Sequence, residues 1–238
     1  MLTSLKLGDI AVEVVYKPIK NVHLSVYPPA GRVRMAAPER MDLEALRLYA
    51  ISKLPWIKRQ RRRMQEQERE APREYLERES HYVWGKRYLL SVVEENAPPS
   101  VELGPSRLTL HIRPGSDRSK RRNVLQNWYR EQVRQAAEPL LTRWERKIGV
   151  KSSGLFVRRM KTRWGSCNPV AKTVWLNTEL ACKPPRCLEY ILVHELVHLL
   201  EPSHNERFQA FMQQFLPDWK LRRQELNRLP VRHEDWGY

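Results

Sequence analysis

Two histidines and a glutamate lie close together in the second half of the chain, in the order His194, Glu195 and His198. On a helix, residues four positions apart project from the same face, so His194 and His198 can direct two imidazoles at one point. Glu195 projects from the adjacent surface, within reach of a water molecule bound there. Neutral imidazole ligands beside a carboxylate are what a zinc hydrolase requires. The motif therefore predicts one Zn²⁺ ion, with Glu195 as the general base acting on a zinc-activated water.

The residues around this motif are almost all apolar. They predict a buried helix rather than a solvated one, and they include Leu192, Val193, Leu196, Val197, Leu199 and Leu200. Burying two histidines and a glutamate costs desolvation energy unless these groups have partners. A shared metal ion would provide one partner for both histidines, whereas hydrogen bonding inside a core is the simpler alternative.

The third ligand must come from the chain beyond this helix. Pro202 disfavours a continuing helix, so we predict that the helix ends just before it. Ser203 and Glu206 have the spacing of a capping box, which predicts a second helix from about His204, with that histidine in its first turn. We predict His204 as the third ligand, because a histidine placed by a fixed corner suits tetrahedral zinc. The alternative ligands are three carboxylates, Glu201, Glu206 and Glu225. The first of these could instead fix the corner or orient a ligand.

The segment before the helix predicts a small antiparallel sheet. Residues 154–160 and 173–177 are predicted strands, and Trp164 to Pro169 has the composition of a turn. An extended peptide could add to the edge of such a sheet beside the metal. The proline pair at 184–185 is tolerated at a helix start, because the first amides of a helix lack partners.

Hydrolysis of a peptide bond also needs a donor for the tetrahedral oxyanion. The candidates for this transition-state or substrate contact are Arg163, Tyr190, Arg207 and His233. Cys167 is an alternative nucleophile, but the metal mechanism is better supported by the residues present.

Residues 155–226 resemble the YgjP-like zinc metallopeptidases, which are related to SprT and WLM-type proteins. The matching segments are Met160–Cys167, Trp175–Asn177, Tyr190–Leu199 and Leu216–Trp219, with single matches at Leu180, His204, Arg207 and Phe208. Weaker matches are Lys53–Ile57 and Gly85–Tyr88. The resemblance implies a gluzincin- or metzincin-like peptidase domain with His194, His198 and His204 on zinc and Glu195 as base. Metzincins have a glycine where this chain has Glu201, and no Met-turn is evident, which argues against a true metzincin.

The remaining pattern predicts an α+β protein in two parts. Residues 1–115 are predicted as a β-rich N-terminal region with one long basic helix, and residues 116–238 as a mostly helical zincin-like metallopeptidase domain. Predicted strands cover residues 10–16, 22–27, 32–36, 82–93 and 108–112. One predicted helix starts at about Asp42 and is kinked at Pro55, and another spans residues 119–147. No internal repeat stands out.

The charge balance allows a second interpretation. The formal net charge is +16, and the densest basic clusters span residues 58–63 and 118–122. Such patches attract polyanions, although nearby glutamates balance part of them. No base-reading motif is present. The alternative function is therefore a nucleic-acid-associated protein, either a protease acting on DNA-bound proteins or a non-catalytic zinc-containing binding module. An interaction protein without metal is a third possibility.

Composition also limits the setting of the protein. No apolar run approaches 18 residues and no signal-peptide core is evident, so we expect no membrane span. Cys167, Cys182 and Cys187 are odd in number and lack metal-ligand spacing, which favours reduced thiols in a cytoplasmic protein. The expected partner is a peptide or protein substrate. Its identity and the oligomeric state cannot be read from one chain.

Overall fold

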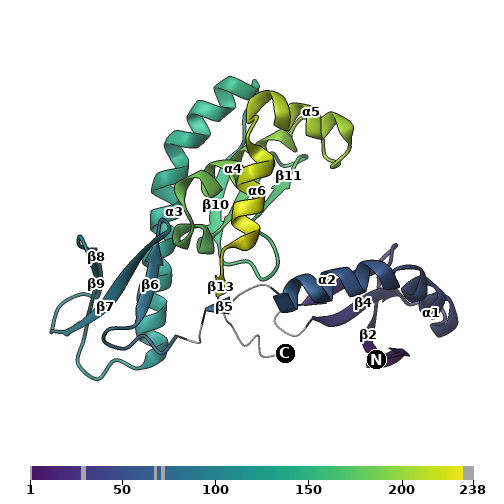
Figure 1. The fold of residues 1–238 in the computed structure, drawn as a ribbon, viewed down its shortest axis with the longest axis horizontal. Helices are drawn as coiled ribbons and strands as arrows, with labels where there is room; N and C mark the ends of the chain where they lie inside the picture. The colour runs from purple at the N-terminus through teal and green to yellow at the C-terminus, as the bar shows by residue number, and fades with distance from the viewer. Residues whose placement is uncertain (1, 28–30, 67–68, 71–72, 233–238) are drawn as a thin grey trace. The chain divides into compact units, whose positions relative to one another are not determined.

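The computed structural model describes residues 2–27, 31–66, 69–70 and 73–232. Contacts divide the chain into two compact units, Met1–Glu70 with Pro230–Tyr238, and Ala71–Leu229. Strands dominate the first unit and the start of the second, and helices dominate the rest (Figure 1). The predicted α+β class is therefore confirmed. The units differ in extent from the predicted parts 1–115 and 116–238, and the assignment of those parts as domains stays a prediction.

The first unit contains a four-stranded sheet in the order β1-β2-β4-β3. Its strands are β1 (Leu2–Leu7), β2 (Ile10–Lys17), β3 (His23–Tyr27) and β4 (Arg32–Pro38). Alternate residues of β2 and β4 are buried, as expected for strands with one covered face. Apolar residues of α1 (Leu43–Ser52) and α2 (Leu54–Glu66) complete this core. Strand β1 was not predicted.

The helical part of the first unit begins as predicted but is divided. The side chain of Asp42 accepts a hydrogen bond from the Ala45 amide and caps α1. The helix then stops at Lys53, and α2 starts at Leu54. Two helices replace one kinked helix because Pro55 disfavours helical geometry in the residue before it. A short pair, β5 (Arg69–Glu70) with β13 (Val231–Arg232), joins distant parts of the chain.

The second unit opens with another four-stranded sheet, in the order β6-β7-β9-β8. Its strands are β6 (Ser80–Val83), β7 (Lys86–Glu94), β8 (Ser100–Leu103) and β9 (Arg107–Ile112). The predicted strand 82–93 is thus a hairpin. Its two turn residues, Trp84 and Gly85, both have positive φ, at 50° and 80°. That backbone matches the twist of a two-residue hairpin, which strand periodicity alone does not reveal.

The two four-stranded sheets have the same topology. In each, an antiparallel hairpin is followed by a parallel pairing of its second strand and then by a second hairpin. Five residues connect the two hairpins in both sheets, at 18–22 and at 95–99. A helix capped by an aspartate follows each sheet, at Asp42 and at Asp117. The chain therefore contains a structural repeat that its sequence does not show.

A third sheet lies beside the metal-binding histidines in sequence. Its strands, in the order β10-β12-β11, are β10 (Gly154–Arg158), β12 (Thr173–Asn177) and β11 (Gly165–Asn168). The predicted antiparallel pairing of residues 154–160 with residues 173–177 is wrong, since β10 runs parallel to β12. The predicted turn contains β11, which forms the antiparallel pair with β12 instead. The side chain of Asn168 accepts hydrogen bonds from Val170 and Ala171, which tightens the real turn.

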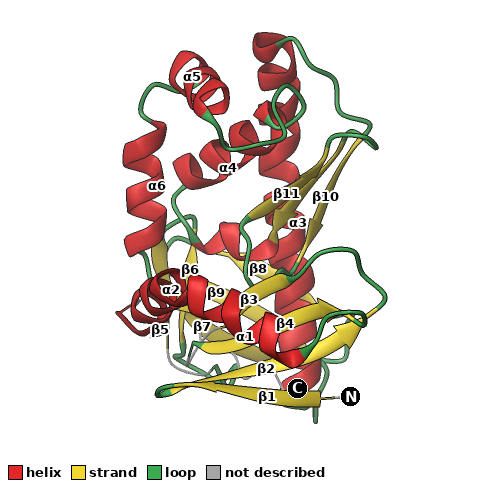
Figure 2. Cartoon of the chain, turned by 90° about the vertical axis from the view of Figure 1, so that its right-hand side faces the viewer, coloured by secondary structure: helices red, strands yellow, loops and turns green. Residues whose placement is uncertain are grey.

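Helices complete the second unit. The 31-residue helix α3 (Arg118–Ile148) covers the predicted helix 119–147. It packs against α4 (Pro185–Val197), the 3₁₀ helix η1 (Thr178–Cys182) and β10. Figure 2 shows α4 between α3 and α6 (Trp219–Arg228), with α5 (Glu206–Phe215) beyond it. Among the described residues, no helix is both long and apolar enough to span a membrane.

Candidate active site

Three histidine rings converge at the end of α4. His194 lies in the last turn of α4, and His198 is its C-cap. The ring centroids of His194 and His198 are 5.0 Å apart, and those of His198 and His204 are 4.6 Å apart. One ring nitrogen from each histidine lies within 4.8 Å of the other two. The structure thus brings all three predicted ligands together.

Glu201 holds the corner that returns the chain to this point. Its backbone carbonyl lies 3.0 Å from Nδ1 of His198. With Nδ1–H donating to that carbonyl, Nε2 of His198 is left to bind a metal. The carboxylate of Glu201 accepts a hydrogen bond of 3.2 Å from the Ser203 amide. Of the roles considered for Glu201, this geometry supports fixing the corner and orienting a ligand.

The capping box predicted after this corner is wrong. Asn205 caps α5 instead, and its side chain accepts a hydrogen bond of 3.0 Å from the Phe208 amide. Helix α5 therefore begins at Glu206, and His204 lies in the corner rather than in the first helical turn. The Ser203 amide is already engaged by Glu201, which is a local contact that the capping pattern could not foresee.

An aromatic side chain packs against all three histidines. The ring of Phe208 lies 4.9, 4.7 and 4.8 Å from the rings of His194, His198 and His204, measured between centroids. Phe208 is 2% exposed, so its ring forms a rigid apolar wall. The sequence indicated this residue only through the family resemblance. Phe208 is the third residue of α5, and this position gave no separate signal.

His194 and His204 are held in the neutral form that binds metals. Burial, with smaller effects from His198, His204 and Arg223, lowers the pKa of His194 to about 3. Burial also lowers the pKa of His204. Both imidazoles are therefore neutral near pH 7, and Nε2 of His194 lies 2.9 Å from Nε2 of His204. Ring nitrogens from three histidines that lie this close together fit a tetrahedral zinc ion with one position left open.

Glu195 lies next to the triad in a closely packed environment. It is 5% exposed, and burial raises the pKa of its carboxyl to about 8, while the charge of Arg163 opposes this effect. Strand β11 approaches it so closely that a Cβ atom at Gly165 would lie 2.6 Å from Glu195 Oε1. Only glycine allows this approach. The sequence showed Gly165 as part of a turn, and its contact with the carboxylate is a tertiary feature.

Asn177 positions the loop that carries Arg163. Its side-chain amide donates hydrogen bonds to the carbonyls of Met160, at 3.0 Å, and Arg163, at 2.7 Å. Its backbone amide donates to the Trp164 carbonyl at 2.9 Å. Because Asn177 is 4% exposed, these bonds satisfy a buried polar group and fix the loop. The sequence indicated Asn177 only as part of the family match, and its hydrogen bonds to the loop are a tertiary feature.

The proposed oxyanion donors differ in position. Tyr190 is buried, and its ring centroid lies 5.9 Å from that of His194. Arg163 is exposed and acts electrostatically on Glu195. Arg207 instead pairs with Glu201 at 4.0 Å and lies over the Phe211 ring. His233 lies outside the described residues. The geometry therefore favours Tyr190 and Arg163 over Arg207.

The thiol of Cys167 is poorly suited to nucleophilic attack. Burial and the charge of Glu195 raise its pKa to about 11. The thiol therefore stays protonated near pH 7, whereas the thiolate is the reactive form.

Comparison with known protein families gives a match over most of the chain. The model of a family described as "YgjP-like, metallopeptidase domain" matches residues 20–229. The chain belongs to the YgjP-like metallopeptidase family, as its sequence motifs indicated. This family assignment covers residues of both compact units.

Two solved structures are similar to parts of the chain. The metallopeptidase zymogen of Pyrococcus abyssi abylysin is 22% identical with a TM-score of 0.35, covering 40% of this chain and 98% of that chain. The metallopeptidase zymogen of Methanocaldococcus jannaschii jannalysin is 21% identical with a TM-score of 0.32, covering 37% of this chain and 95% of that chain. No curated protein matches the chain.

Proposed function

We propose that this metallopeptidase is zinc-dependent and uses Glu195 as its general base. The observation that carries the proposal is the convergence of His194, His198 and His204 beside a buried carboxylate. All three would hold the ion through ring nitrogens, and none of the alternative carboxylate ligands joins this cluster among the described residues. Glu225, for example, pairs with Arg186.

The residues of the chain supply the proton transfers. When bound, zinc lowers the pKa of a coordinated water and polarises the scissile carbonyl. Glu195 accepts a proton from the attacking water and delivers it to the leaving amine. A carboxyl group whose pKa is raised by burial holds that proton readily between the two transfers. The charge of Arg163 favours the ionised state that must accept it.

The strand next to Glu195 offers a place for the substrate backbone. Strand β11 is at the edge of its three-stranded sheet, and Gly165 in it contacts the glutamate. An extended peptide can pair with such an edge through main-chain hydrogen bonds. This pairing would place a scissile bond within reach of the general base. A protein or peptide with an extended segment is therefore the proposed substrate.

The first test is the Glu195→Gln variant, assayed with a peptide library and zinc quantitation. We expect zinc content to stay at one ion per chain, while hydrolysis falls by about 10²- to 10⁴-fold because the proton acceptor is lost. Glu206→Gln is the matched control, since this exposed residue was a rival ligand. It should change neither quantity. Full activity of Glu195→Gln would refute the assigned role.

The second test addresses the metal. Replacement of His204 by alanine should abolish stoichiometric zinc binding, because only two protein ligands remain. Removal of zinc by a chelator should abolish hydrolysis, and zinc should restore it. Unchanged zinc content in His204→Ala would show that another residue completes the site.

A second function, contact with nucleic acid, is favoured by a different surface. Phe156 of β10 and Trp175 of β12 stack with ring centroids 4.6 Å apart, and Phe156 is 43% exposed. The guanidinium of Arg158 lies over the Trp175 ring at 4.4 Å. The loop that follows lines a hollow of about 360 Å³ with Arg158, Arg159, Lys161 and Arg163. Aromatic rings beside cationic groups are the features by which proteins bind single strands.

The basic clusters at residues 58–63 and 118–122 are less available for binding a polyanion. Arg118 donates to the Arg73 carbonyl, and Arg121 pairs with Glu94 at 3.1 Å. In α2, Arg61 pairs with Asp9 at 3.7 Å. Part of each cluster therefore stabilises the fold. We propose that polyanion contact, where it occurs, uses the face of the third sheet.

The fluorescence anisotropy of labelled single-stranded DNA can test this second function. Adding the protein at low salt should raise the anisotropy, and the effect should weaken steeply as salt rises. Trp175→Ala should reduce the affinity by a factor of about 10, since each base–aromatic stack contributes about 1–3 kcal/mol. An absence of binding at low ionic strength would eliminate this function.

A further inference from the structure

A cavity of about 620 Å³ adjoins the histidine triad. It shares two walls with the metal site, His194 and His204, and its remaining walls come from α4, α5 and α6. A peptide whose scissile bond lies at the metal would place a neighbouring residue in this cavity. The lining of the cavity therefore bears on substrate selection.

The lining is cationic and amidic, with aromatic walls. Lys220 and Arg223 supply positive charge, and none of the described residues that line the cavity is an aspartate or glutamate. The aromatic walls are Tyr190, Phe208 and Trp219, and the amides are Gln209, Gln224 and Asn227. The three aromatic residues are all buried, so the walls are rigid. Such a lining favours a negatively charged group over a positive one.

The sequence of α6 explains how the cationic face arises. Lys220, Arg223, Gln224 and Asn227 lie three and four residues apart, so they share one face of the helix. The acidic groups near α6 are engaged elsewhere. Glu189 pairs with Arg222 at 2.6 Å, and Glu225 pairs with Arg186. The positive charge at the cavity is therefore not cancelled by these neighbours.

Arg223 is the residue on this face best suited to bind a ligand. It is exposed and makes no hydrogen bond or ion pair within the part of the chain that the structure describes. Its charge contributes to the lowered pKa values of His194 and His204, which places it electrostatically close to the metal ligands. A guanidinium binds a carboxylate through two parallel hydrogen bonds, and this geometry gives both strength and selectivity.

We propose that this cavity is a substrate subsite that binds a carboxylate next to the scissile bond, with Arg223 as its partner. The inference rests on the proposed peptidase function and names its substrate class. The carboxylate comes either from an acidic side chain or from the C-terminus of the substrate. Both sources present the same group, and they are separated by experiment.

The experiment begins with the wild-type protein, zinc and a library of unmodified peptides, with cleavage sites identified by mass spectrometry. We expect aspartate, glutamate or a free C-terminus to be enriched beside the cleaved bond. An acidic peptide of the library, chosen from the cleaved ones where cleavage occurs, is then made in three forms, with its acidic residue intact, with that residue as the amide, and with an amidated C-terminus. The form that loses binding identifies the source of the carboxylate.

Binding is measured by fluorescence anisotropy in the Glu195→Gln background, where turnover does not interfere. Arg223→Gln should weaken binding of the acidic peptide by about tenfold or more, which is the scale of a charge-assisted pair. The affinity for the amide form of the peptide should stay unchanged. Arg228→Gln is the matched control, because Arg228 is an exposed residue of α6 that does not line the cavity. Arg223→Glu should shift the preference toward a lysine-containing peptide.

The outcomes separate the two proposals. Equal affinities in the Arg223→Gln and Arg228→Gln variants for the acidic peptide would overturn the subsite. Cleavage without any acidic or C-terminal preference would also overturn it. If the protein binds acidic peptides through Arg223 but cleaves none, the subsite stands and the peptidase mechanism fails. If the Glu195→Gln protein binds no peptide at all, the subsite is refuted.

Discussion

The two four-stranded sheets share one topology but differ in what they bury. In the first unit, the inward residues of β1 are Leu5 and Leu7, and the core around them is apolar. In the second unit, the corresponding strand β6 buries His81 and Val83. Each pair precedes a two-residue hairpin turn, so Leu5 and His81 occupy equivalent positions. One architecture thus tolerates either an apolar or an ionisable residue there.

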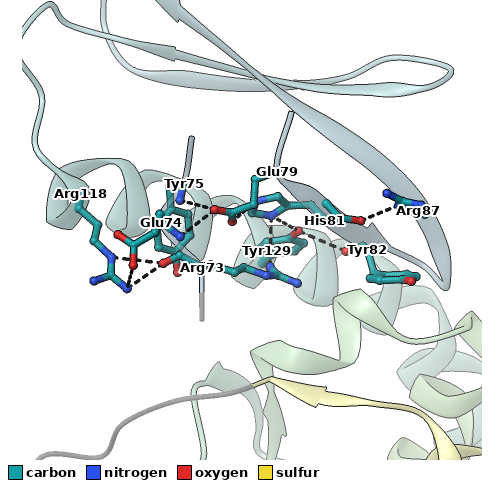
Figure 3. Close-up of polar contacts among 10 residues, drawn as sticks. Arg73, Glu74, Tyr75, Glu79, His81, Tyr82, Arg87, Arg118 and Tyr129 are labelled. Atoms are coloured by element: carbon teal, nitrogen blue, oxygen red, sulfur yellow. Dashed lines mark hydrogen bonds and ion pairs between the residues drawn. The ribbon is translucent and has the colours of Figure 1, made fainter. Parts of the chain in front are cut away.

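A polar network makes the buried histidine tolerable. Figure 3 shows His81 among Arg73, Glu79 and Tyr129. Nε2 of His81 lies 2.9 Å from Glu79, and Nδ1 lies 3.2 Å from Arg73. With Nε2–H donating to the carboxylate, Nδ1 can accept from the guanidinium. The carboxylate of Glu79 in turn accepts hydrogen bonds of 2.7 Å from the backbone amides of Glu74 and Tyr75. The network therefore ties the segment before β6 to the sheet.

The hairpins of the two sheets also differ in what they contact. The Trp84 amide donates to the Ala181 carbonyl at 2.7 Å, and a Cβ at Gly85 would lie 2.9 Å from Pro184. The hairpin of the second unit thus packs against η1 and the start of α4, which carries His194. By contrast, a Cβ at Gly8, in the hairpin of the first unit, would meet no atom within 4 Å. The difference shows that the sheet of the second unit supports α4 through its Trp84–Gly85 turn.

The largest expected effect is on the polar network. His81→Leu gives the second sheet the apolar residue of the first, but it leaves Arg73 and Glu79 without their shared partner. Removing one member of a buried ionic group costs about 3–5 kcal/mol, so we expect a loss of this size in urea unfolding. Tyr129→Phe, which removes only a hydroxyl, should cost about 1 kcal/mol. Unchanged stability of His81→Leu would mean that the two sheets are interchangeable at this position.

The hairpin glycines provide a matched pair of intermediate effect. Both have positive φ, at 63° for Gly8 and 80° for Gly85, so alanine at either position should cost about 1–2 kcal/mol of backbone strain. Gly85→Ala adds overlap with Pro184, which should raise the total to about 2–4 kcal/mol. Only Gly85→Ala should also reduce zinc affinity, measured by competition with a chelator. Equal zinc affinity in the two variants would contradict the supporting role of this hairpin.

The smallest expected effect depends on pH. Burial alone would raise the pKa of Glu79, but hydrogen bonds from His81 and from two backbone amides lower it overall. A lowered folded-state pKa contributes stability above the unfolded value, near 4.5, and this stability is lost as pH falls through the folded value. Below about pH 4.5 we expect a loss of roughly 1 kcal/mol in thermal or urea unfolding. Glu79→Gln should remove this part of the pH dependence, and an identical acid profile in that variant would argue against the network.

Much of the active site was predictable because it depends on local spacing. Helical periodicity placed His194 and His198 on one face, the proline pair marked the start of α4, and Asp42 marked the start of α1. The predicted end of the active-site helix just before Pro202 was too late, since α4 ends at Val197. The length of α3 followed from its apolar period. Two of the errors were also local in origin. The capping pattern at Ser203 competed with Asn205, and strand periodicity did not show the turn at Trp84–Gly85.

The family, the α+β class and the metal-binding motif were determined by the sequence itself, since each follows from residue types at short separations. Tertiary structure decided the rest. It brought Gly165 against Glu195, made β10 parallel to β12, and used one sheet topology twice. These features arise from contacts between residues far apart in the chain, and their free energies depend on packing that no local pattern encodes.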